Sequence, residues 1–170
     1  MIVVNFIGAP GAGKSTLAAD VFAELKWLNI NSELVTEYAK EMVWEENYKI
    51  LGNQLFLLSQ QQNRIERLKG KVDVVVTDSP IFHSLLYNDC IYPSFVNLVK
   101  EIHDSYDNLN FLVKRTKKYH KVGRMQTENE SDLLYDKLIE ILKSHPIPLI
   151  KVDGSKDSIP FIIEKIKERI

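Results

Sequence analysis

The sequence has one cysteine, no long hydrophobic run and no excess of charge of one sign, and each shortage excludes something. Cys90 has no partner within the chain, so an internal disulfide is excluded; we interpret it as a structural thiol and expect a cytoplasmic protein. The apolar stretches fall far short of the roughly 20 residues that span a membrane, so no membrane association is expected. Lys and Arg total 22 against 23 Asp and Glu, which provides no overall attraction to nucleic acid.

No internal repeat, low-complexity segment or Pro-, Gly- or Ser-rich linker interrupts residues 1–170, which predicts one domain. Apolar or β-branched runs predict strands at Ile2–Ile7, Glu33–Thr36, Val72–Thr77, Asn110–Val113 and Pro148–Val152. Apolar residues three and four apart predict helices over Leu17–Leu28, Leu51–Leu68, Leu134–Leu142 and Phe161–Ile166. This alternation predicts a three-layer α/β fold with a five-stranded parallel sheet, in which ligands bind at the carboxyl ends of the strands.

A glycine-rich motif follows the first predicted strand. Residues 8–15 read Gly-Ala-Pro-Gly-Ala-Gly-Lys-Ser and match the P-loop pattern at every specified position. Backbone N–H groups of such a loop cradle phosphates, the lysine reaches the β- and γ-phosphates, and the serine hydroxyl ligates Mg²⁺. A chance glycine-rich turn does not explain why strand, loop, Lys-Ser pair and helix occur in register. We therefore predict a P-loop NTPase fold that binds ATP and Mg²⁺ through Gly8, Gly11, Ala12, Gly13, Lys14, Ser15 and Thr16.

The second predicted strand ends beside Glu37 and Tyr38. A glutamate at this point is expected to face the same cleft as the P-loop, where its carboxylate orients or deprotonates an acceptor hydroxyl. The alternative is an ordinary helix start, with Thr36 as the cap and Glu37 in the first turn. Tyr38, Trp44 and Tyr48 either stack on a base or belong to the core and rim of the fold.

The next predicted helix is rich in amides. Gln54, Gln61 and Arg64 fall within reach of one face, and such groups read a base edge through paired hydrogen bonds. An ordinary solvated helix face explains them equally well. We keep Gln54 and Gln61 as candidate substrate contacts.

The third predicted strand ends at Asp78. An apolar strand that closes on aspartate is the Walker-B arrangement, in which the carboxylate holds the Mg²⁺ shell. Ser79 and Pro80 then predict a helix N-cap followed by proline in the first turn. His83 would face the acceptor from that helix, but a lone histidine is more often structural, and we do not count it among the candidates.

A basic segment follows the fourth predicted strand. Residues 114–124 contain six Lys and Arg and no acid, whereas a solvated loop usually mixes both signs. We interpret residues 114–127 as a lid that closes on the triphosphate, with Arg115 and Arg124 neutralising charge on the transferred phosphoryl group. The same cations also suit a DNA backbone. After the last strand, the loop around Gly154 is a candidate cradle for adenine.

The order of these features resembles the small P-loop kinases of the nucleoside and nucleotide kinase superfamily, over nearly the whole chain. The pattern looks most similar to ribosylnicotinamide-kinase-like proteins and their phage relatives. Their strand-two Glu-Tyr, Gln-bearing helix, strand-three Asp and basic lid correspond here to Glu37-Tyr38, Gln54 with Gln60 or Gln61, Asp78, and Arg115 to Arg124. Some phage relatives phosphorylate 5-hydroxymethyluracil within DNA. The resemblance therefore implies a nucleoside-type acceptor, with DNA as one candidate, and the host cytoplasm if the protein is phage-encoded.

Deoxynucleoside kinases are similar at one remove. Their strand-two glutamate serves as the base toward a sugar hydroxyl, which matches Glu37. Their third strand ends in Glu-Arg-Ser and that of adenylate-kinase-type enzymes in Asp-Gly, whereas this chain has Asp78-Ser79-Pro80. This departure argues against a free deoxynucleoside as acceptor.

The sequence is compatible with three hypotheses about function. The first is a kinase in which Glu37, Lys14, Asp78, Arg115 and Arg124 carry out phosphoryl transfer. The second is an ATPase or nucleotide-dependent switch, which needs a residue that positions water. The third is a module that only senses nucleotide. The sequence indicates neither the oligomeric state nor which acceptor is used.

Overall fold

The computed structural model describes residues 1–87, 92 and 94–170, so the interpretation of Cys90 lies outside the described residues. The five-stranded parallel sheet that the sequence predicts is confirmed, and its strand order is β2-β3-β1-β4-β5. Their bounds are β1 Ile2–Ile7, β2 Ser32–Val35, β3 Val74–Thr77, β4 Asp107–Lys114 and β5 Ile150–Asp153. Because all strands are parallel, their carboxyl ends share one edge of the sheet.

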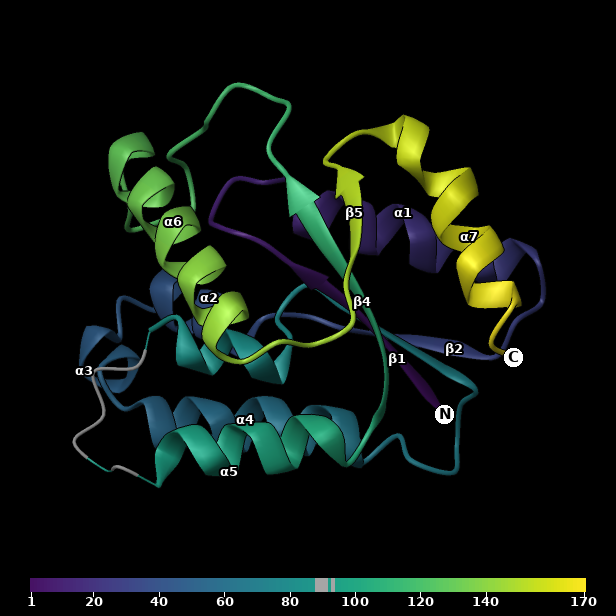
Figure 1. The fold of residues 1–170 in the computed structure, drawn as a ribbon, viewed down its shortest axis with the longest axis horizontal. Coiled ribbons are helices and arrows are strands. Elements are labelled where there is room, and N and C mark those ends of the chain that lie inside the picture. Colours follow the sequence, from purple (N-terminus) through teal and green to yellow (C-terminus); the bar gives the residue numbers. More distant parts are fainter. Residues whose placement is uncertain (88–91, 93) are drawn as a thin grey trace.

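Helices cover both faces of the sheet (Figure 1). On one face, α1 (Lys14–Trp27) and α7 (Ile159–Lys167) pack on Val4, Phe6 and Phe111. On the other face, α4 (Gln54–Glu66), α5 (Phe95–Asp104) and α6 (Glu128–Ser144) pack on the alternate strand residues, among them Val3 and Ile7. Strands buried on both faces explain the continuous apolar runs in the sequence.

Several helix boundaries differ from those predicted. The helix expected over Leu51–Leu68 is divided into α3 (Tyr48–Leu51) and α4, because the Asn53 side chain accepts the Phe56 N–H at 3.1 Å and caps a new helix. Ser79 is not an N-cap as predicted: Pro80 holds that position, and a short 3₁₀ helix, η1 (Ile81–Leu85), follows it. A second 3₁₀ turn, η2 (Lys156–Ser158), precedes α7.

Helix α5 was not expected from the sequence, α3 overlaps the predicted helix only at Leu51, and α2 (Tyr38–Trp44) follows the helix start considered as the alternative for Glu37. The apolar residues Phe95 and Val99, one helical turn apart, are buried and carried a signal for α5. Among the described residues, no helix is both long enough and apolar enough to cross a membrane.

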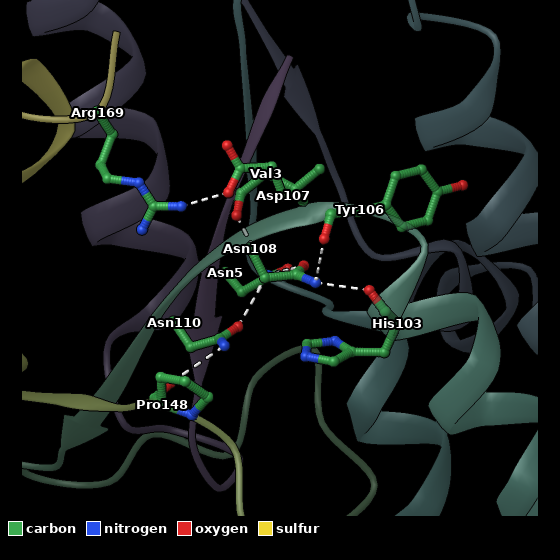
Figure 2. Close-up of polar contacts among 9 residues, drawn as sticks. All are labelled: Val3, Asn5, His103, Tyr106, Asp107, Asn108, Asn110, Pro148 and Arg169. Carbon is green, nitrogen blue, oxygen red and sulfur yellow. Dashed lines mark hydrogen bonds and ion pairs between the residues drawn. The ribbon is translucent and has the colours of Figure 1, made fainter.

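Strand β4 begins three residues before its predicted start at Asn110, because the exposed Asp107 and the half-buried Asn108 are polar and give no apolar signal there. Asn5 of β1 donates to Oδ1 of Asn110 at 2.9 Å and to Oδ1 of Asn108 at 2.8 Å (Figure 2). The Asn108 amide donates in turn to the carbonyls of His103 and Tyr106. These hydrogen bonds satisfy polar side chains in the interior and allow a strand that hydrophobicity alone does not reveal.

Candidate active site

A cavity of about 540 Å³ opens at the carboxyl ends of the strands, where the sequence predicts a ligand. Ten of the predicted residues line it: Gly11, Gly13, Lys14, Ser15, Thr16, Glu37, Tyr38, Gln54, Gln61 and Arg124. Four others, Gly8, Ala12, Asp78 and Arg115, are not part of its wall. The structure therefore brings the P-loop, the end of β2, α4 and the basic segment (residues 114–127) around one space.

The P-loop connects β1 to α1, and α1 begins at Lys14. Gly13, at the N-cap position, has φ 101°, a left-handed conformation that favours glycine. Nζ of Lys14 donates to the carbonyls of Gly8 at 2.9 Å and Ala9 at 3.0 Å. The lysine thus folds back over its own loop, and the first turn of α1 leaves N–H groups available for phosphate oxygens.

Gly8 and Ala12 support the loop rather than line the cavity. A β-carbon at Gly8 would lie 2.9 Å from the Val113 carbonyl oxygen, so the loop passes too close to β4 for any side chain. Gly154, after β5, lies against Ala12 so closely that its own β-carbon would be 2.0 Å from the Ala12 oxygen. The loop around Gly154 therefore also supports the P-loop through its backbone, and its contact with adenine stays a prediction.

Two side chains from other elements also hold the P-loop. The buried Ser131 hydroxyl, in the first turn of α6, donates to the Pro10 carbonyl at 2.6 Å. The N–H of Gly8 donates to Nε2 of His83 at 3.2 Å. Ser131 was not among the residues predicted from the sequence, and His83 was not counted as a candidate, because neither residue belongs to a local motif.

Glu37 lies between β2 and α2, in the cavity wall. A helix does start here, as the alternative interpretation has it, but Glu37 rather than Thr36 occupies the N-cap position of α2, and the Glu37 side chain makes no capping hydrogen bond. Burial raises the pKa of Glu37, and the positive charge of Lys14 opposes the shift. Burial lowers the pKa of Lys14, and the carboxylates of Glu37 and Asp78 oppose that shift in turn. The carboxylate and the P-loop lysine therefore face each other across a desolvated site.

The amide face of α4 supports the turn that carries Glu37. Oε1 of Gln61 accepts the Tyr38 N–H at 3.1 Å, and Nε2 of Gln61 approaches the Thr36 carbonyl at 3.4 Å. Arg64 pairs with Glu41 of α2 through two hydrogen bonds, at 2.8 and 2.6 Å, and its guanidinium lies over the Tyr38 ring. The interpretation of these residues as a solvated helix face is therefore wrong.

Apolar and aromatic side chains form part of the cavity wall, beside the P-loop and several polar side chains. Gln54 is located there, and its Nε2 donates to the Leu51 carbonyl at 3.0 Å. Tyr48 lines the same wall and is 54% exposed, while Trp44, 63% exposed, lies against Gly123 of the cavity lining. The other apolar and aromatic residues of the lining include Tyr38, Val43, Leu51, Leu57, Leu86, Tyr87 and Leu134. A planar base with some polar edges fits such a surface.

Asp78 follows β3 and is 4% exposed, and its Oδ1 has no hydrogen-bond partner among the described residues. Ser15, on the cavity wall, supplies a hydroxyl. Carboxylate and hydroxyl oxygens fit Mg²⁺, which is usually held by one or two carboxylates together with substrate phosphates. Within residues 1–87, 92 and 94–170, no group of three or more His, Cys, Asp and Glu is arranged to hold a metal. Ser15 and Asp78 therefore suit a cation that is shared with a nucleotide.

The basic segment runs from the end of β4 to Thr127, which caps α6 in a capping box with Glu130. It arches beyond the carboxyl edge of the sheet (Figure 1). The Arg124 guanidinium lies 5.7 Å from the centre of the Tyr119 ring and lines the cavity. Arg115 lies 5.6 Å from the same ring but pairs with Asp132 and Glu128 of α6, outside the cavity wall.

A family model described as AAA domain matches residues 3–158, most of the chain. The chain belongs to the AAA domain family. No curated protein matches this AAA domain chain in sequence.

Solved structures show the same fold. Thymidylate kinase from Ehrlichia chaffeensis has a TM-score of 0.63 at 16% identity, covering 99% of this chain and 97% of that one. Deoxyadenosine kinase from M. mycoides, with dCMP and dCDP as products, has a TM-score of 0.59 at 18% identity, covering 98% and 99%. Its structure with dATP has a TM-score of 0.56 at 19% identity, covering 99% and 98%. This AAA domain protein therefore has the P-loop kinase fold, and its narrower resemblance to ribosylnicotinamide-kinase-like proteins stays a prediction.

Proposed function

We propose that this protein is an ATP-dependent kinase that transfers the γ-phosphate to a hydroxyl of a nucleoside-type acceptor. One observation carries the proposal: a single cavity is lined by the P-loop, by Glu37 opposite Lys14, and by an apolar and aromatic wall. The P-loop suits the donor phosphates, and the apolar wall suits a base. Glu37 lines the same cavity and interacts electrostatically with Lys14, which supports a role for it beside the transferred phosphoryl group.

The residues then act mainly by position and charge. Lys14 leaves the carbonyls of its own loop and binds the β- and γ-phosphates, while Glu37 accepts the proton of the acceptor hydroxyl as it attacks. Arg124 offsets negative charge on the transferred group from the basic segment. Ser15 and Asp78 would hold Mg²⁺, which neutralises phosphate charge when bound. Arg115 is proposed for the same role as Arg124, and it must first leave its ion pairs with Asp132 and Glu128.

Glu37 also favours a hydroxyl acceptor over a monophosphate. The oxygens of a phosphate are already ionised near neutral pH, because the second pKa is about 6, and they need no base. A hydroxyl needs one, and a glutamate whose pKa is raised by burial is suited to that task. This argument supports a nucleoside or a hydroxymethylated base ahead of a nucleoside monophosphate.

The specific acceptor that we propose is the 5-hydroxymethyl group of 5-hydroxymethyluracil in DNA. Two surface features support it beyond the sequence resemblance. Exposed lysines of the basic segment, among them Lys117 and Lys118, suit a phosphate backbone. The exposed rings of Trp44 and Tyr48 suit stacking with bases of a single strand at the cavity.

The test is transfer from radiolabelled ATP to a panel of acceptors. The panel contains free nucleosides, nucleoside monophosphates, DNA with 5-hydroxymethyluracil, and the same DNA with thymine. Label on the hydroxymethylated DNA alone supports the specific proposal, and label on a free nucleoside or monophosphate supports a kinase of small metabolites. Phosphate release at the same rate without any acceptor would contradict the kinase and support an ATPase.

A further inference from the structure

His83 contacts the P-loop from a different element. It lies on η1, is 8% exposed, and lines the cavity. Its Nε2 accepts the backbone N–H of Gly8 at 3.2 Å. An amide N–H only donates, so Nε2 must carry the lone pair, and the neutral imidazole has its proton on Nδ1.

Gly8 is held through both of its backbone polar groups. Its N–H donates to His83, and its carbonyl accepts from Nζ of Lys14 at 2.9 Å. The Val113 carbonyl lies against its α-carbon, so the residue cannot move toward β4. Any shift of Gly8 would have to be toward η1, and it would displace the Gly8 carbonyl oxygen to which Nζ of Lys14 donates.

We propose that His83 is a positioning residue of the nucleotide site: it fixes Gly8, and through Gly8 it keeps the P-loop in the arrangement from which Lys14 reaches a triphosphate. The phosphate-transfer readout of this inference rests on the proposed kinase function, whereas the nucleotide-binding readout does not. His83 itself need not touch the nucleotide.

The electrostatics of the site agree with a neutral ring. Burial lowers the pKa of His83 well below its ordinary value, and the charge of Lys14 lowers it further. Lys14 is the charged group set against the ring. Lys14 interacts in turn with Glu37 and Asp78, which follow β2 and β3, with Arg124 of the basic segment and with Lys40 of α2. A protonated His83 would direct a second N–H at the Gly8 N–H and place a cation beside Lys14.

The experiment compares two substitutions at His83 with a matched control. His83→Gln keeps an acceptor oxygen near the position of Nε2, whereas His83→Leu removes the acceptor. The control is His103→Leu on α5, a second buried histidine, which is absent from the cavity wall. Affinity for Mg²⁺-ATP is measured by calorimetry, transfer by the radiolabel assay, and folding by thermal denaturation.

The expected result is a loss of ATP affinity of roughly tenfold in His83→Leu, since a buried N–H is left without an acceptor. His83→Gln should restore most of the affinity, and His103→Leu should retain it even if its melting temperature falls. Full ATP affinity in folded His83→Leu overturns the inference. Equal losses in the Gln and Leu variants overturn it too, because ring size rather than the hydrogen bond would then matter.

Two further readouts keep the inference testable. If no acceptor is ever phosphorylated but ATP affinity follows the expected order, the proposed kinase function fails and the role of His83 stands. If His83→Leu does not fold, the inference is tested in the wild-type protein by the ring ¹⁵N chemical shifts of His83, which report the tautomer. The neutral Nδ1–H tautomer, with Nε2 unprotonated, should be the form present at neutral pH. A protonated Nε2 under those conditions overturns the inference.

Discussion

The ring of Tyr119 lies directly against Gly11 of the P-loop. A β-carbon at Gly11 would be 2.7 Å from Cδ2 of the ring, and the Tyr119 hydroxyl donates to the Gln126 carbonyl at 2.7 Å. The guanidinium groups of Arg115 and Arg124 both lie over this ring. The packing of Tyr119 on Gly11 therefore fixes the distance between the basic segment and the P-loop. Only glycine at position 11 leaves room for this contact.

A comparison of Gly11→Ala with Gly70→Ala should separate the effect of the contact with Tyr119 from the effect of backbone strain. Gly11 has φ 78° and Gly70 has φ 74°, but nothing lies within 4 Å of a β-carbon at Gly70. Both substitutions should cost about 1 kcal/mol of unfolding free energy, because alanine disfavours positive φ. Only Gly11→Ala should also weaken ATP binding and reduce transfer, by about 100-fold for transfer. Equal ATP affinity in the two variants would contradict this prediction, because it would mean that the Tyr119 ring can move away without any effect on the phosphate site.

Glu37→Gln tests the proposed base. We expect transfer to fall by about 10² to 10⁴-fold, because the amide cannot accept the hydroxyl proton, while ATP affinity changes little. The measurement is the rate of transfer at saturating ATP beside the ATP dissociation constant. Glu45→Gln, at an exposed position after α2, is the matched control and should behave as wild type. Undiminished transfer in Glu37→Gln would remove Glu37 from the mechanism.

Gln61→Leu tests whether the turn around Glu37 must be held. The substitution leaves the Tyr38 N–H and the Thr36 carbonyl without the Gln61 amide, at a cost of about 1 kcal/mol of unfolding free energy. Transfer should fall by about tenfold or more because Glu37 loses its placement, with ATP affinity retained. Gln60→Leu on the same helix serves as the control. Comparable losses of transfer in both variants would point to α4 as a whole rather than to this amide.

Asp78→Asn tests the Mg²⁺ site. The buried carboxylate has a free Oδ1, and an amide removes its charge with little change in size. We expect the Mg²⁺ concentration at half-maximal transfer to rise by about tenfold, while ATP binding without Mg²⁺ is retained. A magnesium titration identical to that of the wild type would exclude Asp78 from the metal shell.

Two buried histidines predict how stability depends on pH. Burial lowers the folded-state pKa values of His83 and His103 below the ordinary 6.5. Below that value the unfolded chain binds protons that the folded chain does not, so the free energy of unfolding should fall as pH drops through 6.5. Each histidine contributes at most about 1.4 kcal/mol per pH unit. Urea denaturation of His83→Gln should show a shallower fall than that of the wild type, and an unchanged slope would contradict the shift.

Local motifs explain what the sequence could predict. The P-loop is specified by consecutive residues and a strand-to-helix context, and Glu37 and Asp78 follow from the rule that ligands bind where parallel strands end. The sheet was predicted because its strands are continuously apolar. Strand β4 was shortened in the prediction because its first two residues, Asp107 and Asn108, are polar and are not fully buried.

The remaining features depend on contacts between distant residues. Gln61 holds a turn 25 positions away, His83 reaches Gly8 across 75 positions, and Ser131 reaches Pro10 across 121. Side-chain conformation and packing decide such pairs, and neither periodicity nor composition carries that information. Arg115 illustrates the same limit: its charge suggested a role at the phosphates, but two acids on the following helix hold it elsewhere.

The asparagines between β1 and β4 have a consequence for the spacing of the active site. Apolar alternation along a strand repeats every two residues, so it does not by itself prevent two neighbouring strands from sliding by that amount. Asn5 opposite Asn110 does prevent it, because a slipped pairing would bury an amide against Ile7 or Leu112. Such a slip would move the basic segment about 7 Å along the P-loop. The side-chain amides of Asn5, Asn108 and Asn110 thus fix the register of β1 and β4, and with it the position of the basic segment relative to the P-loop.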